Sequence, residues 1–226
     1  MAFSNIELRN FRCFEKLSLD LSPKSTLLYG KNGCGKTSIL ESIFVASSGR
    51  SFRTSNLESL IKEGAEAFTI KAYDDLHGSI LEIKKQRKHS ISIKINDSRV
   101  TASELVRAFP SFSIDSKTFF YNDNAPEYRR KHIDRGLFVA SPEYAKNWFG
   151  YFRALKQRNS ALKQNYPKLY ISSIDEKLNE FANLLDFKRQ AYFKKLKPQI
   201  YKILAEFNSD IKLDIQYYRG WNNEKD

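Results

Sequence analysis

The sequence predicts a mixed α/β fold in which a helical lobe is inserted into a strand-rich lobe that carries a glycine-rich loop. Three observations lead to this prediction. Short extended runs fill the first third of the chain, a strand–loop–helix pattern surrounds Gly30–Thr37, and long helical periods replace the strand signals after about Pro110. We therefore expect the strand-rich lobe at residues 1–111, the helical lobe at 112–209, and a strand at 210–226 that returns to the first lobe.

The first lobe is expected to be largely β-structure around one helix. Alternation and turn residues place its strands at Asn5–Phe11, Leu17–Leu21, Ser25–Gly30, Ala67–Tyr73, a run from Ile80, and Ile91–Asn96. In the last of these, isoleucines alternate with polar residues, which is typical of a half-exposed antiparallel strand. A helix is expected at Thr37–Ala46, where Ile39, Leu40, Ile43 and Phe44 recur at helical spacing.

The helical lobe is expected to contain three helices. Pro126 suits the first turn of the first helix, in which Asp134 is placed to pair with Arg130, and Glu143–Lys163 forms the second. Ser173–Glu176 reads as a capping box that opens the third helix, and Pro198 is expected to break or kink it. The apolar positions of this third helix are Ile174, Leu178, Phe181 and Leu185.

The glycine-rich loop matches G-x-x-x-x-G-K-[ST] and lies between an expected strand and an expected helix. In this pattern backbone N–H groups cradle phosphates, the lysine reaches the β- and γ-phosphates, and the hydroxyl ligates Mg²⁺. The sequence therefore predicts a site for ATP with Mg²⁺, in which Thr37 is the metal ligand. The expected nucleotide-binding residues are Gly30, Lys31, Asn32, Gly33, Cys34, Gly35, Lys36, Thr37 and Ser38.

Cys34 lies inside this loop, between two glycines that lack shielding side chains. We expect it to react readily with maleimide, and we expect the adduct to block the nucleotide, with Cys13 as the internal control.

The charge balance indicates a polyanionic partner. The chain has 38 Lys and Arg against 26 Asp and Glu, a formal net charge of +12. No acidic residue occurs from Tyr144 to Ser173, where Lys146, Arg153 and Lys156 flank a helix face formed by Trp148, Phe152, Leu155, Asn159 and Leu162. A second basic cluster contains Lys84, Lys85, Arg87 and Lys88. Both clusters are candidate DNA contacts, and the alternatives are a solvated basic face and an exposed hairpin.

Several classes of protein are disfavoured. Two cysteines indicate a reduced, cytoplasmic protein, and no apolar run has the length that spans a bilayer. The three histidines lack metal-ligand spacing, so no metal beyond Mg²⁺ is expected.

The motifs resemble a known family. IELRNFRCFEKLSLDLSP followed by LLYGKNGCGKTSILESIF is similar to the ATPase heads of the SMC and ABC-type superfamily, and APEYRRKHIDRGLF, YFRALKQRNSALKQ and YYRGW are similar to the RecF family. The resemblance implies a cytoplasmic bacterial protein of recombinational repair, replication-fork restart and the SOS response. It implies an ATP-dependent homodimer that clamps single-stranded or gapped DNA, works with other recombination mediators and hydrolyses ATP slowly. It also places Arg50 and Arg53 near nucleotide and DNA, and Arg12 near the nucleotide.

Two motifs that the resemblance implies are not found. These are the signature motif and the Walker B strand with its catalytic glutamate, so the catalytic residues stay unassigned and we expect this chain to be the N-terminal portion of a longer protein. The alternatives are a P-loop kinase and a DNA-binding module whose nucleotide site is idle. ATP-dependent DNA affinity separates the main interpretation from both.

Overall fold

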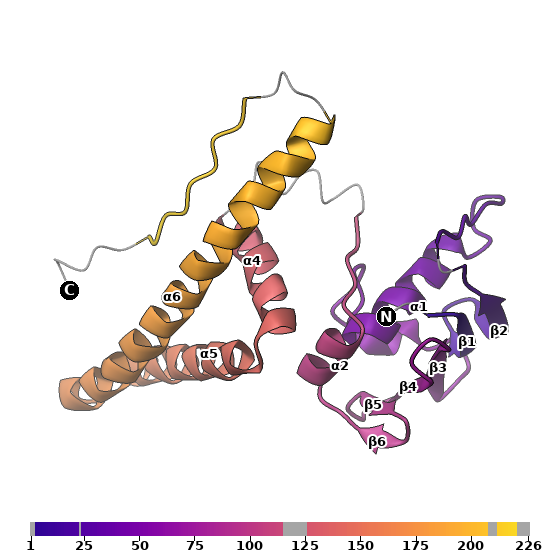
Figure 1. The fold of residues 1–226 in the computed structure, drawn as a ribbon. Helices are drawn as coiled ribbons and strands as arrows, with labels where there is room; N and C mark the ends of the chain where they lie inside the picture. The colour runs from indigo at the N-terminus through magenta and orange to yellow at the C-terminus, as the bar shows by residue number, and fades with distance from the viewer. Residues whose placement is uncertain (1–2, 23, 115–125, 208–211, 221–226) are drawn as a thin grey trace. The chain divides into compact units, whose positions relative to one another are not determined.

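The computed structural model describes residues 3–22, 24–114, 126–207 and 212–220. It divides the chain into two compact units, Met1–Phe119 and Phe120–Asp226. The strands and the glycine-rich loop belong to the first unit and the long helices belong to the second (Figure 1). The predicted mixed α/β fold class is confirmed. None of the described helices combines the length and apolar character that a bilayer crossing requires.

The first unit is built on one antiparallel sheet in the order β2-β1-β3-β4-β5-β6. Its strands are β1 (Asn5–Phe11), β2 (Phe14–Asp20), β3 (Ala67–Asp74), β4 (Ser79–Gln86), β5 (Ser92–Ile95) and β6 (Ser98–Arg99). Burial alternates along the central strands, so Ile6 and Leu8 of β1 and Phe68 and Ile70 of β3 point to one buried face. This alternation fixes the register, because a slip of one residue would expose the whole apolar set.

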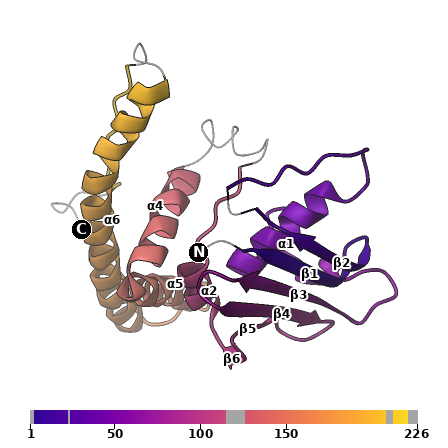
Figure 2. The same cartoon turned by 45° about the vertical axis from the view of Figure 1, so that its right-hand side comes forward.

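Helix α1 (Lys36–Ser48) lies against this buried face (Figure 2). The face of α1 that is buried carries small residues, among them Ser38, Ser42, Val45 and Ala46. Leu40, which the sequence places on the packed face, is 52% exposed. The apolar residues whose spacing predicts α1 are therefore divided: Ile43 packs against the core, Leu40 points to solvent, and small side chains let the helix approach the sheet closely.

Three further parts of the first unit differ from the sequence expectation. Ser25–Gly30 is extended but forms no strand, and Leu27 and Tyr29 are 84% and 87% exposed. A strand exists only with a hydrogen-bonded neighbour, and the described residues supply none here. Helix α2 (Ala102–Ala108), with a Thr101–Glu104 capping box, and the 3₁₀ helix η1 (Leu57–Leu60) were not predicted.

The second unit contains helices α4 (Pro126–Ala140), α5 (Pro142–Lys163) and α6 (Lys168–Phe207). The predicted positions of α4 and α5 are confirmed to within one residue at their starts. A four-residue connection turns α5 back into α6, and Gly150 of α5 permits close packing, since a Cβ there would lie 2.6 Å from the Phe181 ring. Ile174 and Leu185 of α6 are buried, as their spacing predicts.

Helix α6 is longer than the sequence suggests. It begins at Lys168, so Ser173 lies inside it and donates to the Tyr170 carbonyl rather than capping a helix start. Pro198 lies within the helix, which continues to Phe207, so the helix is not broken there, and a kink at Pro198 stays a prediction. The local signal at Ser173 failed because Ile171 and Ile174 pack against Ala154 and Ala161 of α5, which stabilises helix on both sides of Ser173.

The packed face of α5 also differs from the predicted one. Tyr144, Ala154 and Ala161 are buried, whereas Phe152 and Leu162 are exposed and Trp148 is half-buried. The small residues lie toward α6, which draws the two helices together and turns the predicted aromatic face partly outward.

A buried polar network joins the three helices. Asp134 of α4 accepts hydrogen bonds from the Tyr144 hydroxyl (2.5 Å), Trp148 Nε1 (3.1 Å) and Arg189 Nε (2.7 Å). The expected Asp134–Arg130 pair is therefore replaced by a pair with Arg189 of α6. Burial and the hydrogen bond to Asp134 raise the pKa of Tyr144 well above its ordinary value. Tyr144 therefore stays a neutral donor.

Residues 212–219, where a strand is expected, form none and lie along α6. The Tyr217 hydroxyl donates to Asp186 (2.7 Å), and Arg219 Nε lies 3.2 Å from the same carboxylate. Residues 210, 211 and 221–226 of the expected strand lie outside the described residues, and its return to the first lobe stays a prediction.

Candidate nucleotide-binding site

The glycine-rich loop ends in a left-handed residue that starts α1. Gly35 is the N-cap, with φ 96° and ψ 5°, and a Cβ there would meet the Phe14 ring at 2.4 Å. No side chain caps α1, and its first turn has no acidic residue. The first N–H groups of the helix and its partial positive charge therefore face the loop without a competing anion, as a phosphate site requires.

Lys36 is folded back over the loop. Its Nζ donates to the carbonyls of Gly30 (2.7 Å) and Lys31 (2.8 Å) and lies 3.8 Å from the Cys34 Sγ. The ammonium group is held by exposed, neutral acceptors, which an anionic ligand outcompetes.

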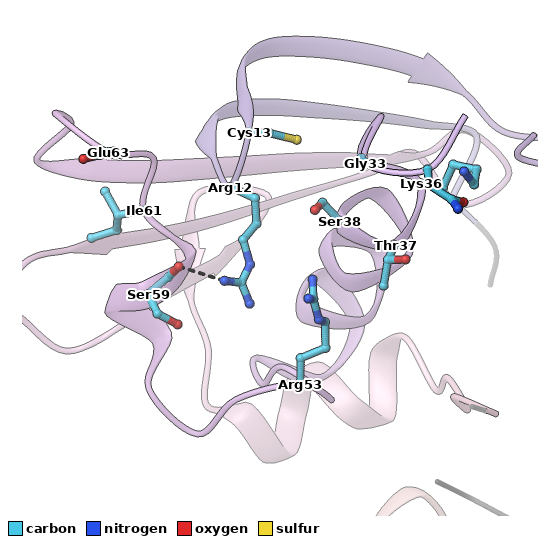
Figure 3. A pocket seen from close by; sticks show the side chains of 12 residues that line it. Arg12, Cys13, Gly33, Lys36, Thr37, Ser38, Arg53, Ser59, Ile61 and Glu63 are labelled. Atoms are coloured by element: carbon cyan, nitrogen blue, oxygen red, sulfur yellow. Dashed lines mark hydrogen bonds between the residues drawn. The ribbon is translucent and has the colours of Figure 1, made fainter. Parts of the chain in front are cut away.

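A two-residue hairpin forms the opposite wall. Phe11 pairs with Phe14 across Arg12 and Cys13, and Arg12 has the left-handed φ of 53°. The Arg12 amide donates to the Leu60 carbonyl (2.7 Å), and its Nη1 donates to the Ser59 carbonyl (3.0 Å). These bonds direct the Arg12 side chain toward the start of α1, as Figure 3 shows.

The carboxylate of Glu41 binds the Arg12 side chain of this wall. Glu41 is fully buried in α1 and accepts from Arg12 Nε and Nη2, both at 2.9 Å, and from the Ser51 hydroxyl at 2.5 Å. Arg53 Nη1 lies 3.6 Å from the same carboxylate. Burial raises the pKa of Glu41, but the hydrogen bonds from Arg12 and Ser51 outweigh it, so the pKa is lowered overall. Glu41 is thus a buried anion that orients two arginines.

These elements line a cavity of about 640 Å³ that is open to solvent, a size common for small-ligand sites. Of the predicted nucleotide-binding residues, its lining includes Arg12, Asn32, Gly33, Gly35, Lys36, Thr37 and Ser38. Gly30, Lys31 and Cys34 do not line it, and the first two act through their carbonyls on Lys36. Arg53, predicted near both nucleotide and DNA, lies in the cavity wall, whereas Arg50 is exposed outside the lining.

Sequence reasoning missed several lining residues and the carboxylate beneath them. The cavity also contacts Cys13, Ser59, Ile61 and Glu63. No sequence signal identifies these four residues, because the β1–β2 hairpin, the 3₁₀ helix η1 and the turn after it bring them to the site through the fold. Glu41 had a signal: it shares a helix face with Ser38, Ser42 and Val45, and a lone acid on a buried face needs a cationic partner.

Some side chains of the predicted basic clusters are exposed to solvent, and others are hydrogen-bonded within the protein. Lys146, Arg153 and Lys156 of α5 are exposed, as are Lys84 and Lys88 of the β4 region. Lys85 is buried and donates to Glu58 (3.1 Å) and to the carbonyls of Gln86 and His89, and Arg87 Nε donates to the Ala65 carbonyl (3.1 Å). Lys85 therefore cannot reach a phosphate backbone without leaving its carboxylate, and we remove it from the candidate DNA contacts.

Comparison with known proteins bears on this site. Residues 1–225 match the AAA ATPase domain family. The chain is 46% identical over its whole length to the DNA replication and repair protein RecF of Francisella tularensis subsp. holarctica, and it spans 65% of that protein. A solved structure of the recombination mediator protein RecF, described as RecF-ATP, superposes with a TM-score of 0.82 at 28% identity and covers 91% of this chain and 57% of that one.

The Smc head domain from Pyrococcus furiosus, at 18% identity and a TM-score of 0.54, covers 92% of this chain and 65% of that one and has a related fold. The predicted likeness to RecF and to SMC-type heads is confirmed.

Proposed function

The chain belongs to the AAA ATPase domain family, and we propose that it is an ATP-binding protein of DNA repair and replication. One observation supports the proposal that the chain binds ATP. An uncapped helix N-terminus, Lys36 and two arginines fixed by Glu41 face the same cavity. The RecF described with ATP and the RecF named for replication and repair support this proposal.

Each residue has a role in this proposal. The loop and α1 N–H groups receive phosphate oxygens, and Lys36 exchanges the Gly30 and Lys31 carbonyls for the terminal phosphates. The Thr37 hydroxyl would ligate Mg²⁺, whose other ligands would be phosphate oxygens and water. Arg12 and Arg53 add positive charge at the cavity wall.

Binding to ATP is tested by calorimetry on Lys36→Ala. We expect ATP affinity to fall at least about a hundredfold, since the variant loses a charge-assisted contact to phosphate and keeps the fold. Lys71→Ala is the matched control, because Lys71 pairs with Glu82 on β4 and does not line the cavity. Equal affinity in the Lys36 variant and the wild type would remove the assignment.

We further propose that DNA contacts the exposed cations of α5 and of the β4 region, together with Arg50. The longer proteins that share this sequence would form an ATP-dependent dimer that clamps gapped DNA, act with other recombination mediators and hydrolyse ATP slowly. The test compares DNA affinity by fluorescence anisotropy with and without Mg-ATP, and oligomeric state by light scattering. DNA affinity that ignores ATP would favour an idle nucleotide site, and phosphate transfer to a small acceptor would favour a kinase.

A further inference from the structure

The connection between α5 and α6 carries exposed aromatic and apolar side chains. We define the hairpin tip as Leu162, Lys163, Tyr166, Lys168, Leu169 and Tyr170. Tyr166 and Tyr170 are 45% and 48% exposed, and Leu169 is 84% exposed. None of these side chains belongs to the hydrophobic clusters that hold the described helices together. The fold of this unit therefore does not explain their presence.

The two tyrosines of the hairpin tip contact one another on an ordered backbone. Their ring centroids are 5.0 Å apart with an interplanar angle of 36°. Asn165 takes a left-handed φ of 53°, the Tyr166 amide donates to the Ala161 carbonyl (3.0 Å), and the Tyr170 amide donates to the Pro167 carbonyl (3.0 Å). The turn thus presents a fixed pair of rings to solvent.

The charge around these rings has one sign. Lys163 and Lys168 are exposed, α6 starts at Lys168 without an acidic residue in its first turn, and no acidic residue occurs from Tyr144 to Ile174. The next acid, Asp175, pairs with Arg158 at 2.5 Å. An anionic partner therefore meets cations, a helix N-terminus and aromatic rings at the same place.

We propose that the hairpin tip binds single-stranded DNA, with bases stacked on the Tyr166 and Tyr170 rings and phosphates beside Lys163 and Lys168. Cations alone suit a duplex, but exposed rings gain from a base only when that base is unstacked, as in a single strand. Charged residues are depleted from the centre of protein interfaces, whereas here the charged residues beside the rings are both cationic and exposed, which favours a polyanion. The inference rests on the proposed role in DNA repair but concerns a surface separate from Lys146, Arg153 and Lys156.

Fluorescence anisotropy tests the proposal with a labelled oligothymidylate, an abasic oligomer of the same length and a matching duplex. The variants of the 226-residue chain are Tyr166→Ala/Tyr170→Ala and, as control, Tyr166→Phe/Tyr170→Phe, which keeps both rings. We expect the alanine pair to bind oligothymidylate about ten- to a hundredfold more weakly, with abasic and duplex affinity unchanged. The phenylalanine pair should bind all three as the wild type does.

Lysine substitution provides an independent measurement. Lys163→Gln/Lys168→Gln should reduce the salt dependence of oligothymidylate binding by about 0.7 in log–log slope for each lost phosphate contact.

Unchanged oligothymidylate binding in the alanine pair overturns the proposal and favours a protein as the partner of the hairpin tip. An equal loss on the abasic oligomer also overturns it, because stacking needs a base. A failure of the proposed function gives a different result, because duplex binding would then be absent in the wild type. The proposal for the hairpin tip is tested by the difference in oligothymidylate affinity between the wild type and the alanine pair.

Discussion

At the residue scale, the site depends on a carboxylate that never faces solvent. Glu41 is fully buried and touches Arg12, Ser51 and Arg53, two of which line the cavity. A buried carboxylate with this many donors is a fixed point from which flexible arginines gain defined positions. The loop therefore receives its supporting charge from side chains that the carboxylate holds in advance of any ligand.

Glu41→Gln tests this positioning role. We expect ATP to bind about tenfold more weakly, because Arg12 loses the charged acceptor that holds its side chain toward the cavity, and the first unit to lose about 2 kcal/mol of stability, because the Arg12 guanidinium loses its counter-charge. Glu63→Gln, the same change at another cavity glutamate, should leave ATP affinity equal or higher. ATP affinity that is equal to or higher than wild type in both variants, measured by calorimetry, would show that Glu41 acts only through net charge.

The lowered pKa of Glu41 adds a pH dependence. A group whose pKa is lowered by folding contributes stability above its unfolded value, here 4.5, and that stability is lost as pH falls through the folded pKa. Thermal melts below pH 4.5 should therefore fall more steeply with pH in the wild type than in Glu41→Gln. Parallel curves would contradict this linkage.

The two cysteines provide a positional test. Cys13 lines the cavity and lies 3.0 Å from where a Gly35 Cβ would stand, whereas Cys34 is exposed but outside the lining. We therefore expect Mg-ATP to slow maleimide labelling more at Cys13 than at Cys34, which reverses the roles that the sequence suggests. Peptide mapping of Cys13→Ser and Cys34→Ser resolves the sites, and protection confined to Cys34 would refute the placement.

At the element scale, the second unit relies on one cross-helix ion pair. Asp134 and Arg189 are each 13% exposed, and Asp134→Ala should destabilise this unit by about 3 kcal/mol because Arg189 stays buried without its partner. Asp175→Ala breaks a pair between α5 and α6 that is about a third exposed and should therefore cost much less stability than Asp134→Ala. Urea unfolding of both variants makes the comparison, and similar losses would argue against a special role for the network.

Local pattern explains which elements the sequence predicts correctly. Asn5–Phe11 forms β1 with the expected bounds, and the lengths of α4 and α5 follow from caps and periodicity. Pattern did not identify the buried face of α1 or the state of Ser25–Gly30, because each depends on neighbours that sequence spacing does not reveal. The loop was predictable from its own spacing, but Arg12 and Glu41 are 29 residues apart and meet only through the fold.

At the scale of the whole molecule, we expect DNA affinity to depend more on where the positive charges lie than on the net charge. Reversing Lys146, Arg153 and Lys156 to Glu should weaken duplex binding for every sequence alike and lower the log–log salt slope by about 0.9 per lost phosphate contact. Reversing the exposed Lys177, Lys194 and Lys202 of α6 changes the net charge equally and is the control. The same slope in both triple variants would mean that α5 has no privileged contact with DNA.

The exposed apolar side chains beside the phosphate loop affect how readily copies of the chain associate with one another. Leu27, Tyr29 and Leu40 face solvent on a molecule with a net charge of +12, so at low ionic strength like-charge repulsion keeps copies apart. Added salt shortens the range of that repulsion to about 3 Å at 1 M, while leaving apolar attraction intact. Salt therefore acts in opposite directions on two kinds of encounter: it releases the chain from polyanions and brings its own copies together.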